Sequence, residues 1–195
     1  MCEPASFILT ETNEYWSMKS DSHEDILAEH ILAEHNLKDS FGGKPKILRV
    51  EITPPGGNFS APLDQWRYRT DQDVMPDWFD ESVDESRARR ALVAWVAARV
   101  FTSGEHSVTE GRVWACNNAT VRACNNATVR AFNNATVRAF NNAMVEAFNN
   151  AMVEAFNNAT VIRWSSDSKI ELHDLSVCVD RSKYGSVITR KARKK

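Results

Sequence analysis

The sequence predicts an α+β head followed by a β-solenoid, with an α-helix capping the solenoid. The main observation is an octapeptide, Asn-Asn-Ala-Thr-Val-Arg-Ala-Phe, that recurs with few changes between Asn117 and Val161. Short strand-like and helix-like segments fill residues 1–81, and one longer helix-like segment precedes the repeats. A fixed short period is typical of stacked units that bury their apolar faces against neighbours. Copies begin at Asn117, Asn125, Asn133, Asn141, Asn149 and Asn157.

The head is expected to contain a small antiparallel sheet. Residues 6–10 and 15–16 are rich in β-branched and aromatic side chains, which predicts a hairpin across 11–14. Residues 46–53 alternate between apolar and polar side chains, the pattern of a half-buried strand. After a Pro-Pro-Gly-Gly break, residues 65–69 are predicted to return as another strand.

The first helix of the head is predicted from Ser22 to Leu37. Ser22 is a good N-cap, and the acidic Glu24 and Asp25 in the first turn favour the positive end of the helix dipole. Gly42-Gly43 ends the segment.

A second helix over residues 82–104 is predicted to cap the solenoid. Ser82 and Glu85 have the spacing of a capping box, and Ser103-Gly104 supplies a stop. A cap is needed because an open solenoid end exposes apolar core and unpaired strand edges. The helix has an apolar stripe and a set of arginines expected to face solvent. The stripe is Ala88, Leu92, Trp95, Val96 and Val100, and the arginines are Arg87, Arg89 and Arg90.

Each octapeptide reads as one short strand and one corner. Alternation along a strand places Ala119, Val121 and Ala123 inside, with Thr120 and Arg122 outside. The Asn pair supplies the turn, since Asn tolerates left-handed backbone angles and its amide can bond to the Asn of the next coil. The Phe that precedes it is expected to seal the corner.

The repeat frame extends over residues 105–189, followed by a basic tail over 190–195. Residues 111–116 fit as an earlier unit, and residues 175–179 fit as a later one with larger inward side chains. Two units per coil are favoured over three because small Ala-Val-Ala faces suit a thin interior. Two per coil give a flattened tube of about five coils at the strand spacing of ~4.8 Å.

Opposite charges support stacking in either geometry. Two units per coil place Arg130 beside Glu146 and Arg138 beside Glu154, whereas three place Arg122 beside Glu146. Such pairs are compatible with both coil types, so they do not choose between them.

Composition excludes some classes of function. The formal net charge is -2 over 195 residues, so no global field attracts nucleic acid or membrane. The chain lacks a signal peptide and an apolar run of ~20 residues, which predicts a cytoplasmic protein without a membrane partner. The Asn-Ala-Thr sequons, such as the one at Asn118, are then a by-product of the repeat.

The cysteines and histidines predict neither a metal site nor a cofactor. Cys2, Cys116, Cys124 and Cys178 show no metal spacing, and a reducing compartment disfavours disulfides. Cys116 and Cys124 occupy the Phe position of later copies, so they act as small apolar substitutes. The helix histidines His23, His30 and His35 are predicted to be solvated. His30 and His35 are five residues apart, a spacing that turns a helix by ~140°, so they point to different sides and do not form a metal-binding pair.

An enzymatic alternative places a nucleophile at Cys2, assisted by its own amine after removal of Met1, with His23 nearby. The Met-Cys opening resembles class II glutamine amidotransferases, which implies a hydrolase or amidotransferase activity. The chain continues with Glu3-Pro4 where those enzymes usually have Gly. The likeness covers two residues.

A broader resemblance covers nearly the whole chain. The order of several segments is similar to that of uncharacterised bacterial and phage-borne proteins with a C-terminal octapeptide stack. The resemblance implies a prokaryotic or phage setting and this order of parts, and it carries no activity. The segments are Met1-Cys2, residues 6–10, Trp16-Ser17, residues 20–26, Leu63-Asp64-Gln65-Trp66, Asp71-Gln72-Asp73, Pro76-Asp77-Trp78-Phe79 and the octapeptides.

The leading functional hypothesis is a non-enzymatic scaffold that presents a regular solenoid surface to a protein partner. Self-association through a solenoid end is a further expectation. Nucleic-acid binding or mimicry is a weaker alternative because the outward positions mix both signs of charge and lack interleaved aromatics. The predicted contacts are Thr120, Arg122, Thr128, Arg130, Thr136, Arg138, Glu146 and Glu154.

Overall fold

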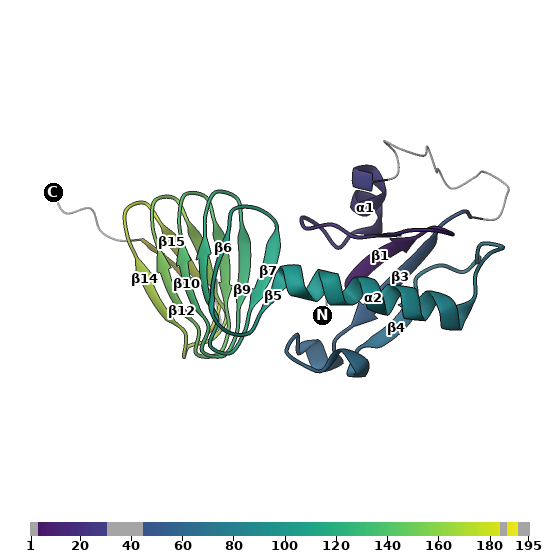
Figure 1. The fold of residues 1–195 in the computed structure, drawn as a ribbon. Helices are drawn as coiled ribbons and strands as arrows, with labels where there is room; N and C mark the ends of the chain where they lie inside the picture. Colours follow the sequence, from purple (N-terminus) through teal and green to yellow (C-terminus); the bar gives the residue numbers. More distant parts are fainter. Residues whose placement is uncertain (1–3, 31–44, 184–186, 191–195) are drawn as a thin grey trace. The chain divides into compact units, whose positions relative to one another are not determined.

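In a computed structural model of the chain, the structure describes residues 4–30, 45–183 and 187–190 (Figure 1). The chain forms two compact units, Met1–Ala98 and Arg99–Lys195, which are called the head and the solenoid. Among the described helices, none is long and apolar enough to cross a membrane. Of the basic tail predicted at 190–195, Arg190 is the last residue of a strand, and residues 191–195 lie outside the described residues.

The head contains a four-stranded antiparallel sheet in the order β2-β1-β3-β4 (Figure 1). Ile8 lies opposite Tyr15, so the predicted hairpin is confirmed. Burial alternates along β3 as predicted, with Leu48, Val50 and Ile52 buried. The strands are β1 Ala5–Leu9, β2 Glu14–Tyr15, β3 Leu48–Thr53 and β4 Arg67–Thr70.

Helix α1, His23–His30, follows directly after Ser22, whose hydroxyl oxygen lies 3.4 Å from the backbone nitrogen of Asp25. Ile26 of α1 packs against Ile8 and Ile47, which fixes the helix on the sheet. The remainder of the predicted helix, up to Leu37, lies outside the described residues. Two short 3-10 helices, η1 Pro55–Gly57 and η2 Leu63–Gln65, connect β3 to β4.

Helix α2, Glu81–Arg99, begins earlier than predicted, and its cap is Asp80 rather than Ser82. The backbone nitrogen of Val83 donates to Oδ1 of Asp80 at 3.0 Å, and the backbone nitrogen of Asp80 donates to Oδ2 of Asp84 at 3.0 Å. These bonds form a reciprocal cap in which a carboxylate replaces the predicted hydroxyl. The bond from Val83 lowers the pKa of Asp80 below its usual value.

The apolar stripe of α2 is largely as predicted, but the expectation that Arg87 faces solvent is wrong. Arg87 is 9% exposed. Its guanidinium donates to Glu14 at 2.8 Å, to Asp84 at 2.9 Å and to the carbonyl of Thr10 at 2.8 Å. A buried charge is stable only when it is paired and hydrogen-bonded in this way. The buried stripe residues include Ala88, Leu92 and Trp95.

The helix also ends earlier than the predicted residue 104. Residues after Arg99 form β5, Val100–Phe101, which pairs in parallel with Trp114 and Ala115 of the solenoid. The side chain of Arg99 is buried within the solenoid unit, where its Nε donates to the carbonyl of Arg112 at 3.0 Å. Capping of the first coil by the helix remains a prediction.

The second unit is a β-solenoid of about five turns, so the predicted solenoid is confirmed (Figure 1). Its strands form two sheets and pair in parallel, except that the last strand, β16, pairs antiparallel with β15. The five-stranded sheet contains β14 Lys169–Leu172, β12 Met152–Ala155, β10 Thr136–Ala139, β8 Thr120–Ala123 and β6 Glu105–Val108. The seven-stranded sheet contains β16 Val187–Arg190, β15 Val177–Asp180, β13 Thr160–Arg163, β11 Met144–Ala147, β9 Thr128–Ala131, β7 Arg112–Ala115 and β5.

Strand register shows how much chain one coil holds. Thr120 pairs with Thr136, which pairs with Met152, so strands sixteen residues apart are neighbours. Each coil in this region therefore contains two eight-residue segments, one in each sheet. The Ala and Val side chains of both sheets meet in one core, where Ala135, Val137 and Ala139 are fully buried.

Each corner that begins an octapeptide copy has a left-handed Asn, as the sequence predicts. The first Asn of every pair has a φ between 51° and 59°. Amides also bond from coil to coil: Nδ2 of Asn133 donates to Oδ1 of Asn117 at 3.0 Å. The neighbouring phenylalanines stack, with ring centroids of Phe132 and Phe148 4.6 Å apart.

The later segment at 175–179 does not follow the predicted frame. Val161 pairs with Cys178, seventeen residues on, because one extra residue enters this coil. Shifting a strand by one residue exchanges its two faces. Ser176 and Cys178 therefore point inward and Leu175 is 56% exposed, so the larger inward side chains expected in this strand are absent. The Ser176 hydroxyl is satisfied by the carbonyl of Ala155 at 3.0 Å.

Substitution of a corner Asn is expected to separate backbone strain from amide bonding. Asn133→Ala should lower the free energy of unfolding by about 1–2 kcal/mol for the left-handed backbone and by about 0.5–1.5 kcal/mol for the lost bond to Asn117. Asn133→Gly should avoid the cost of the left-handed backbone but should still lose the amide bond to Asn117. Urea unfolding measures both, with Asn134→Ala as the matched control. Equal stability of Asn133→Ala and the parent would contradict the corner assignment.

Alkaline pH is expected to weaken the head through Tyr68. Burial, and then the nearby carboxylates of Asp84, Glu85 and Glu81, raise the pKa of Tyr68 to about 12. The phenol titrates near 10 in the unfolded chain, so its stabilising contribution is complete below pH about 10 and is lost as the pH rises towards about 12. Unfolding curves across this window should fall less steeply for Tyr68→Phe. Parallel curves for the two proteins would show that Tyr68 does not carry the effect.

Candidate functional site

The eight predicted contact residues do not form one surface. Five lie on the five-stranded sheet and three on the seven-stranded sheet, and the apolar core lies between the two sheets. Successive octapeptides alternate between the sheets, so consecutive copies face opposite sides. The first set is Thr120, Arg122, Thr136, Arg138 and Glu154, and the second is Thr128, Arg130 and Glu146.

On the seven-stranded face the predicted charges neutralise each other. Nε of Arg130 lies 2.8 Å from Oε2 of Glu146, and these side chains are only 21% and 23% exposed. The Arg130 guanidinium also lies 5.4 Å from the ring centroid of Phe148. This pair is partly buried and already satisfied, so it is poorly placed to bind a partner.

The five-stranded face carries an uneven distribution of charge. Arg122 lies in register with Arg138, and both are exposed. Arg138 pairs with Glu154 at 3.0 Å, whereas no ion pair of Arg122 with a carboxylate is found in the described chain. Like charges opposite each other on neighbouring strands are destabilising. The face therefore presents an unbalanced positive charge at Arg122.

The same column of side chains becomes acidic along the solenoid. Glu154 lies in register with Glu171, so a second like-charge pair follows the arginine pair. His173 lies 3.1 Å from Glu171 and offsets part of this charge when the imidazole is protonated. The column from Arg122 to Glu171, called the charged column below, thus changes sign along its length.

Corner aromatics do not favour the nucleic-acid alternative. Ring centroids of Phe140 and Phe156 are 4.9 Å apart, with nearly parallel planes. Arg122 lies 4.6 Å from the ring centroid of Phe140. The ring faces that a base would stack on are therefore occupied by neighbouring side chains of the solenoid.

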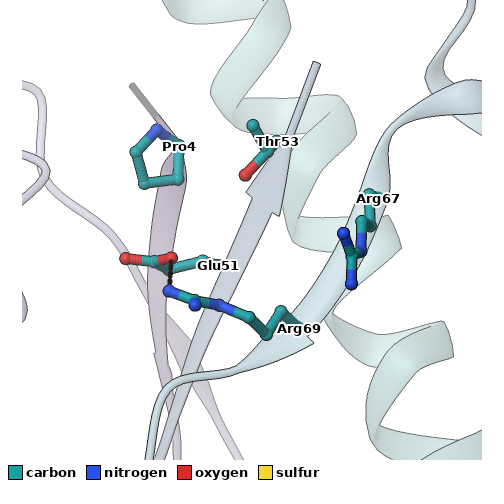
Figure 2. A pocket seen from close by; sticks show the side chains of 5 residues that line it. All are labelled: Pro4, Glu51, Thr53, Arg67 and Arg69. Carbon is teal, nitrogen blue, oxygen red and sulfur yellow. Dashed lines mark hydrogen bonds and ion pairs between the residues drawn. The ribbon is translucent and has the colours of Figure 1, made fainter. Parts of the chain in front are cut away.

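The head has a polar hollow of about 460 Å³ on its sheet, between the start of β1 and the strands β3 and β4 (Figure 2). Nη2 of Arg69 lies 2.5 Å from Oε2 of Glu51 and 3.2 Å from Oδ1 of Asp71. The bond to Glu51 raises the pKa of Arg69 above its usual value. The lining residues are Pro4, Glu51, Thr53, Arg67 and Arg69.

His23 borders this polar region, and the expectation that it is solvated is wrong. It is 9% exposed, with Nε2 3.2 Å from the carbonyl oxygen of Val50 and Nδ1 3.3 Å from Oδ2 of Asp71. The spacing of the histidines along the helix could not predict the burial of His23, because Val50 and Asp71, which contact it, lie far along the chain. Cys2 and His35 lie outside the described residues, so a Cys2–His23 pair remains a hypothesis.

The described cysteines give no catalytic geometry. None of Cys116, Cys124 and Cys178 forms a disulfide. Burial raises the pKa of Cys178, which lowers the fraction of reactive thiolate. These residues fill apolar positions of the solenoid.

The chain matches no protein-family model, no curated protein and no solved structure. Two features of the structure are candidate functional sites: the charged column of the five-stranded sheet, and the polar cluster of His23, Glu51, Asp71 and Arg69 in the head. The first is a fixed array suited to electrostatic recognition. The second brings an imidazole, two carboxylates and a guanidinium together.

Proposed function

We propose that this is a non-enzymatic scaffold protein whose solenoid binds a protein partner through the five-stranded face. The supporting observation is the in-register pair of Arg122 and Arg138, in which the charge of Arg122 is not offset by an ion pair with a described carboxylate. A phage or prophage accessory role follows from the sequence resemblance alone.

The partner is expected to carry acidic side chains opposite the two arginines. A carboxylate between them would relieve their repulsion and accept charge-assisted hydrogen bonds from both guanidinium groups. The acidic end of the charged column, at Glu154 and Glu171, favours basic side chains further along the partner. Such a pattern specifies the orientation of the bound chain as well as its charge.

Rigidity of the solenoid favours this role. Thr136 and its neighbours lie on strands paired on both sides, and the core beneath them is closely filled by Ala and Val. Arg122 is further restrained by its contact with the Phe140 ring. A surface held in its binding geometry loses little conformational entropy on association.

Neutralising the arginines of one face is expected to abolish partner binding. The double variant Arg122→Gln/Arg138→Gln should reduce recovery of the cellular partner by at least tenfold, since it removes the unbalanced charge. Arg130→Gln on the opposite face is the matched control and should retain the partner. Quantitative mass spectrometry of co-purified proteins measures this, with circular dichroism to confirm folding. Undiminished binding by the double variant would reject the assigned face.

A second proposal concerns self-association through the last strand. Val187 and Ile188 of β16 are 62% and 64% exposed, and β16 ends the seven-stranded sheet. An apolar strand at a sheet edge readily pairs with a strand of another chain. A second copy can offer the same strand in antiparallel orientation, which gives a closed dimer.

Sedimentation velocity at increasing concentration tests this pairing. The parent chain should shift towards dimer, and Ile188→Lys should remain monomeric because a charge is placed on the edge strand. Val93→Lys is the matched control, since Val93 is a similarly exposed apolar residue on α2. A parent chain that stays monomeric at high concentration would refute the proposal.

A further inference from the structure

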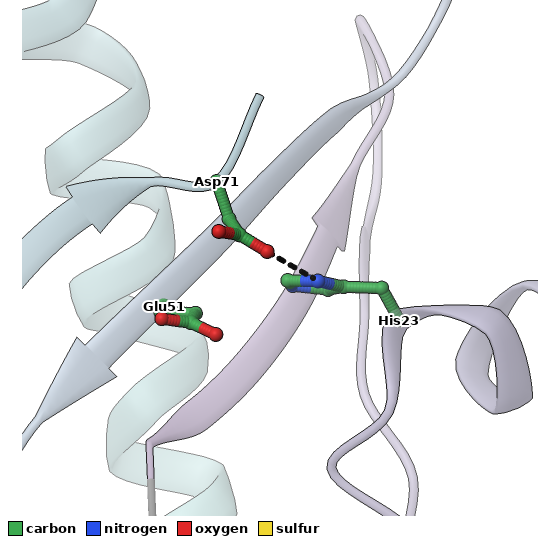
Figure 3. A group of neighbouring side chains, drawn as sticks. All are labelled: His23, Glu51 and Asp71. Carbon is green, nitrogen blue, oxygen red and sulfur yellow. Dashed lines mark ion pairs between the residues drawn. The ribbon is translucent and has the colours of Figure 1, made fainter. Parts of the chain in front are cut away.

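Three side chains of the head converge from separate elements (Figure 3). His23 is the first residue of α1, Glu51 lies in β3, and Asp71 follows β4. One donor atom of each lies within 4.8 Å of the others. The set comprises one imidazole and two carboxylates, and folding alone brings it together.

Both ring nitrogens of His23 lie close to oxygen atoms, and this geometry suits a metal ligand. Nε2 faces the carbonyl oxygen of Val50 at 3.2 Å, and a carbonyl only accepts, so Nε2 carries a hydrogen. In the neutral ring, Nδ1 then presents a lone pair. That lone pair faces Oδ2 of Asp71 at 3.3 Å, so the two atoms are placed to bind the same metal ion.

We propose that this cluster is a binding site for a divalent transition metal, with Nδ1 of His23 and one oxygen each of Glu51 and Asp71 as ligands. A hydrogen bond from the second ring nitrogen to a backbone carbonyl is the usual outer-shell support of a metal-bound histidine. One imidazole with two carboxylates suits Zn²⁺ and related ions. The histidine spacing along α1 gives no sign of this site, because two ligands come from strands.

Arg69 holds the carboxylates without occupying the whole site. Its Nη2 lies 2.5 Å from Oε2 of Glu51 and 3.2 Å from Oδ1 of Asp71, while the other oxygen of Asp71 faces His23. The backbone nitrogen of Asp71 donates to the carbonyl of Arg49 at 2.9 Å, which restrains the backbone of Asp71 and leaves its side chain able to move. Arg69 offsets one of the two carboxylate charges, and a dication would offset the other. Arg67 also lines the hollow that Glu51 borders.

Metal binding requires a modest contraction of the cluster. Ligands at ~2.0–2.1 Å from a tetrahedral ion are about 3.4 Å apart, less than the 4.8 Å limit of the present separation. Asp71 is 40% exposed and can move, whereas buried His23 provides the fixed ligand. Glu51 also lines the polar hollow, so a fourth ligand, such as water or a small anion, can approach from there.

Titration of the untagged full-length chain with Zn²⁺, after removal of metals by a chelator, tests the site. Isothermal calorimetry should show one site per chain. His23→Gln and Asp71→Asn should each weaken binding by at least tenfold. His30→Gln is the matched control, because His30 lies on the same helix and also contacts a backbone carbonyl, that of Trp16. Circular dichroism without metal checks that each variant is folded.

Substitution by Co²⁺ gives an independent readout on the unmodified protein. A visible absorption band of a low-symmetry Co²⁺ site, lost on addition of Zn²⁺, supports the proposal even where a variant does not fold. Absence of binding by the parent chain overturns it. Binding that survives both His23→Gln and Asp71→Asn, or that is lost equally in His30→Gln, places the metal elsewhere and also overturns it.

Discussion

The structure of the solenoid depends on in-register stacking of coils of nearly constant length. Backbone bonds between coils form only when each strand lies directly beside the strand one coil away, as Val121 does with Val137. Sixteen residues per coil then place like positions above one another throughout the repeats. The Ala and Val core, the Asn amide bonds and the stacked rings all follow from that alignment. A corner Asn at positive φ keeps the coil short enough for the alignment to persist.

The last coils show that the stack needs a residue at positive φ at the corner and a ring beside it, and that these need not be Asn and Phe. Asp174, with a φ of 52°, replaces Asn at its corner, and its carboxylate accepts a bond from the backbone nitrogen of Asn157 at 3.0 Å. His173 continues the ring stack with a centroid 4.4 Å from that of Phe156. The extra residue in this coil is absorbed outside the paired strands. The sheet therefore continues although the octapeptide does not.

Most of the solenoid was predictable because its determinants are local and repeated. The alternation of Ala119, Val121 and Ala123 indicates the inward face, and the Asn pairs indicate the corners. The head was less predictable, since its polar contacts join residues far apart in sequence. Arg87 is buried because it binds Glu14 and carbonyls of the first hairpin. His23 lies beside Asp71 because β4, which Asp71 follows, pairs with β3. Such contacts leave no periodic signal in the chain.

The outer faces of the two solenoid sheets differ in how their charged side chains are paired, and this difference bears on which face can bind a partner. Stacking is served by opposite signs on neighbouring strands, as Arg130 and Glu146 show on the seven-stranded sheet. The five-stranded sheet has one such pair, Arg138 with Glu154 at 3.0 Å. It also aligns two like-charge pairs, Arg122 with Arg138 and Glu154 with Glu171. Each like-charge pair weakens the isolated solenoid slightly, since exposed charges interact by only ~0.2–1 kcal/mol. A partner of complementary pattern would relieve both pairs at once. Arg122, which forms no ion pair with a described carboxylate, would thereby gain a favourable interaction on binding. This makes the five-stranded face a better candidate for recognition than the opposite face.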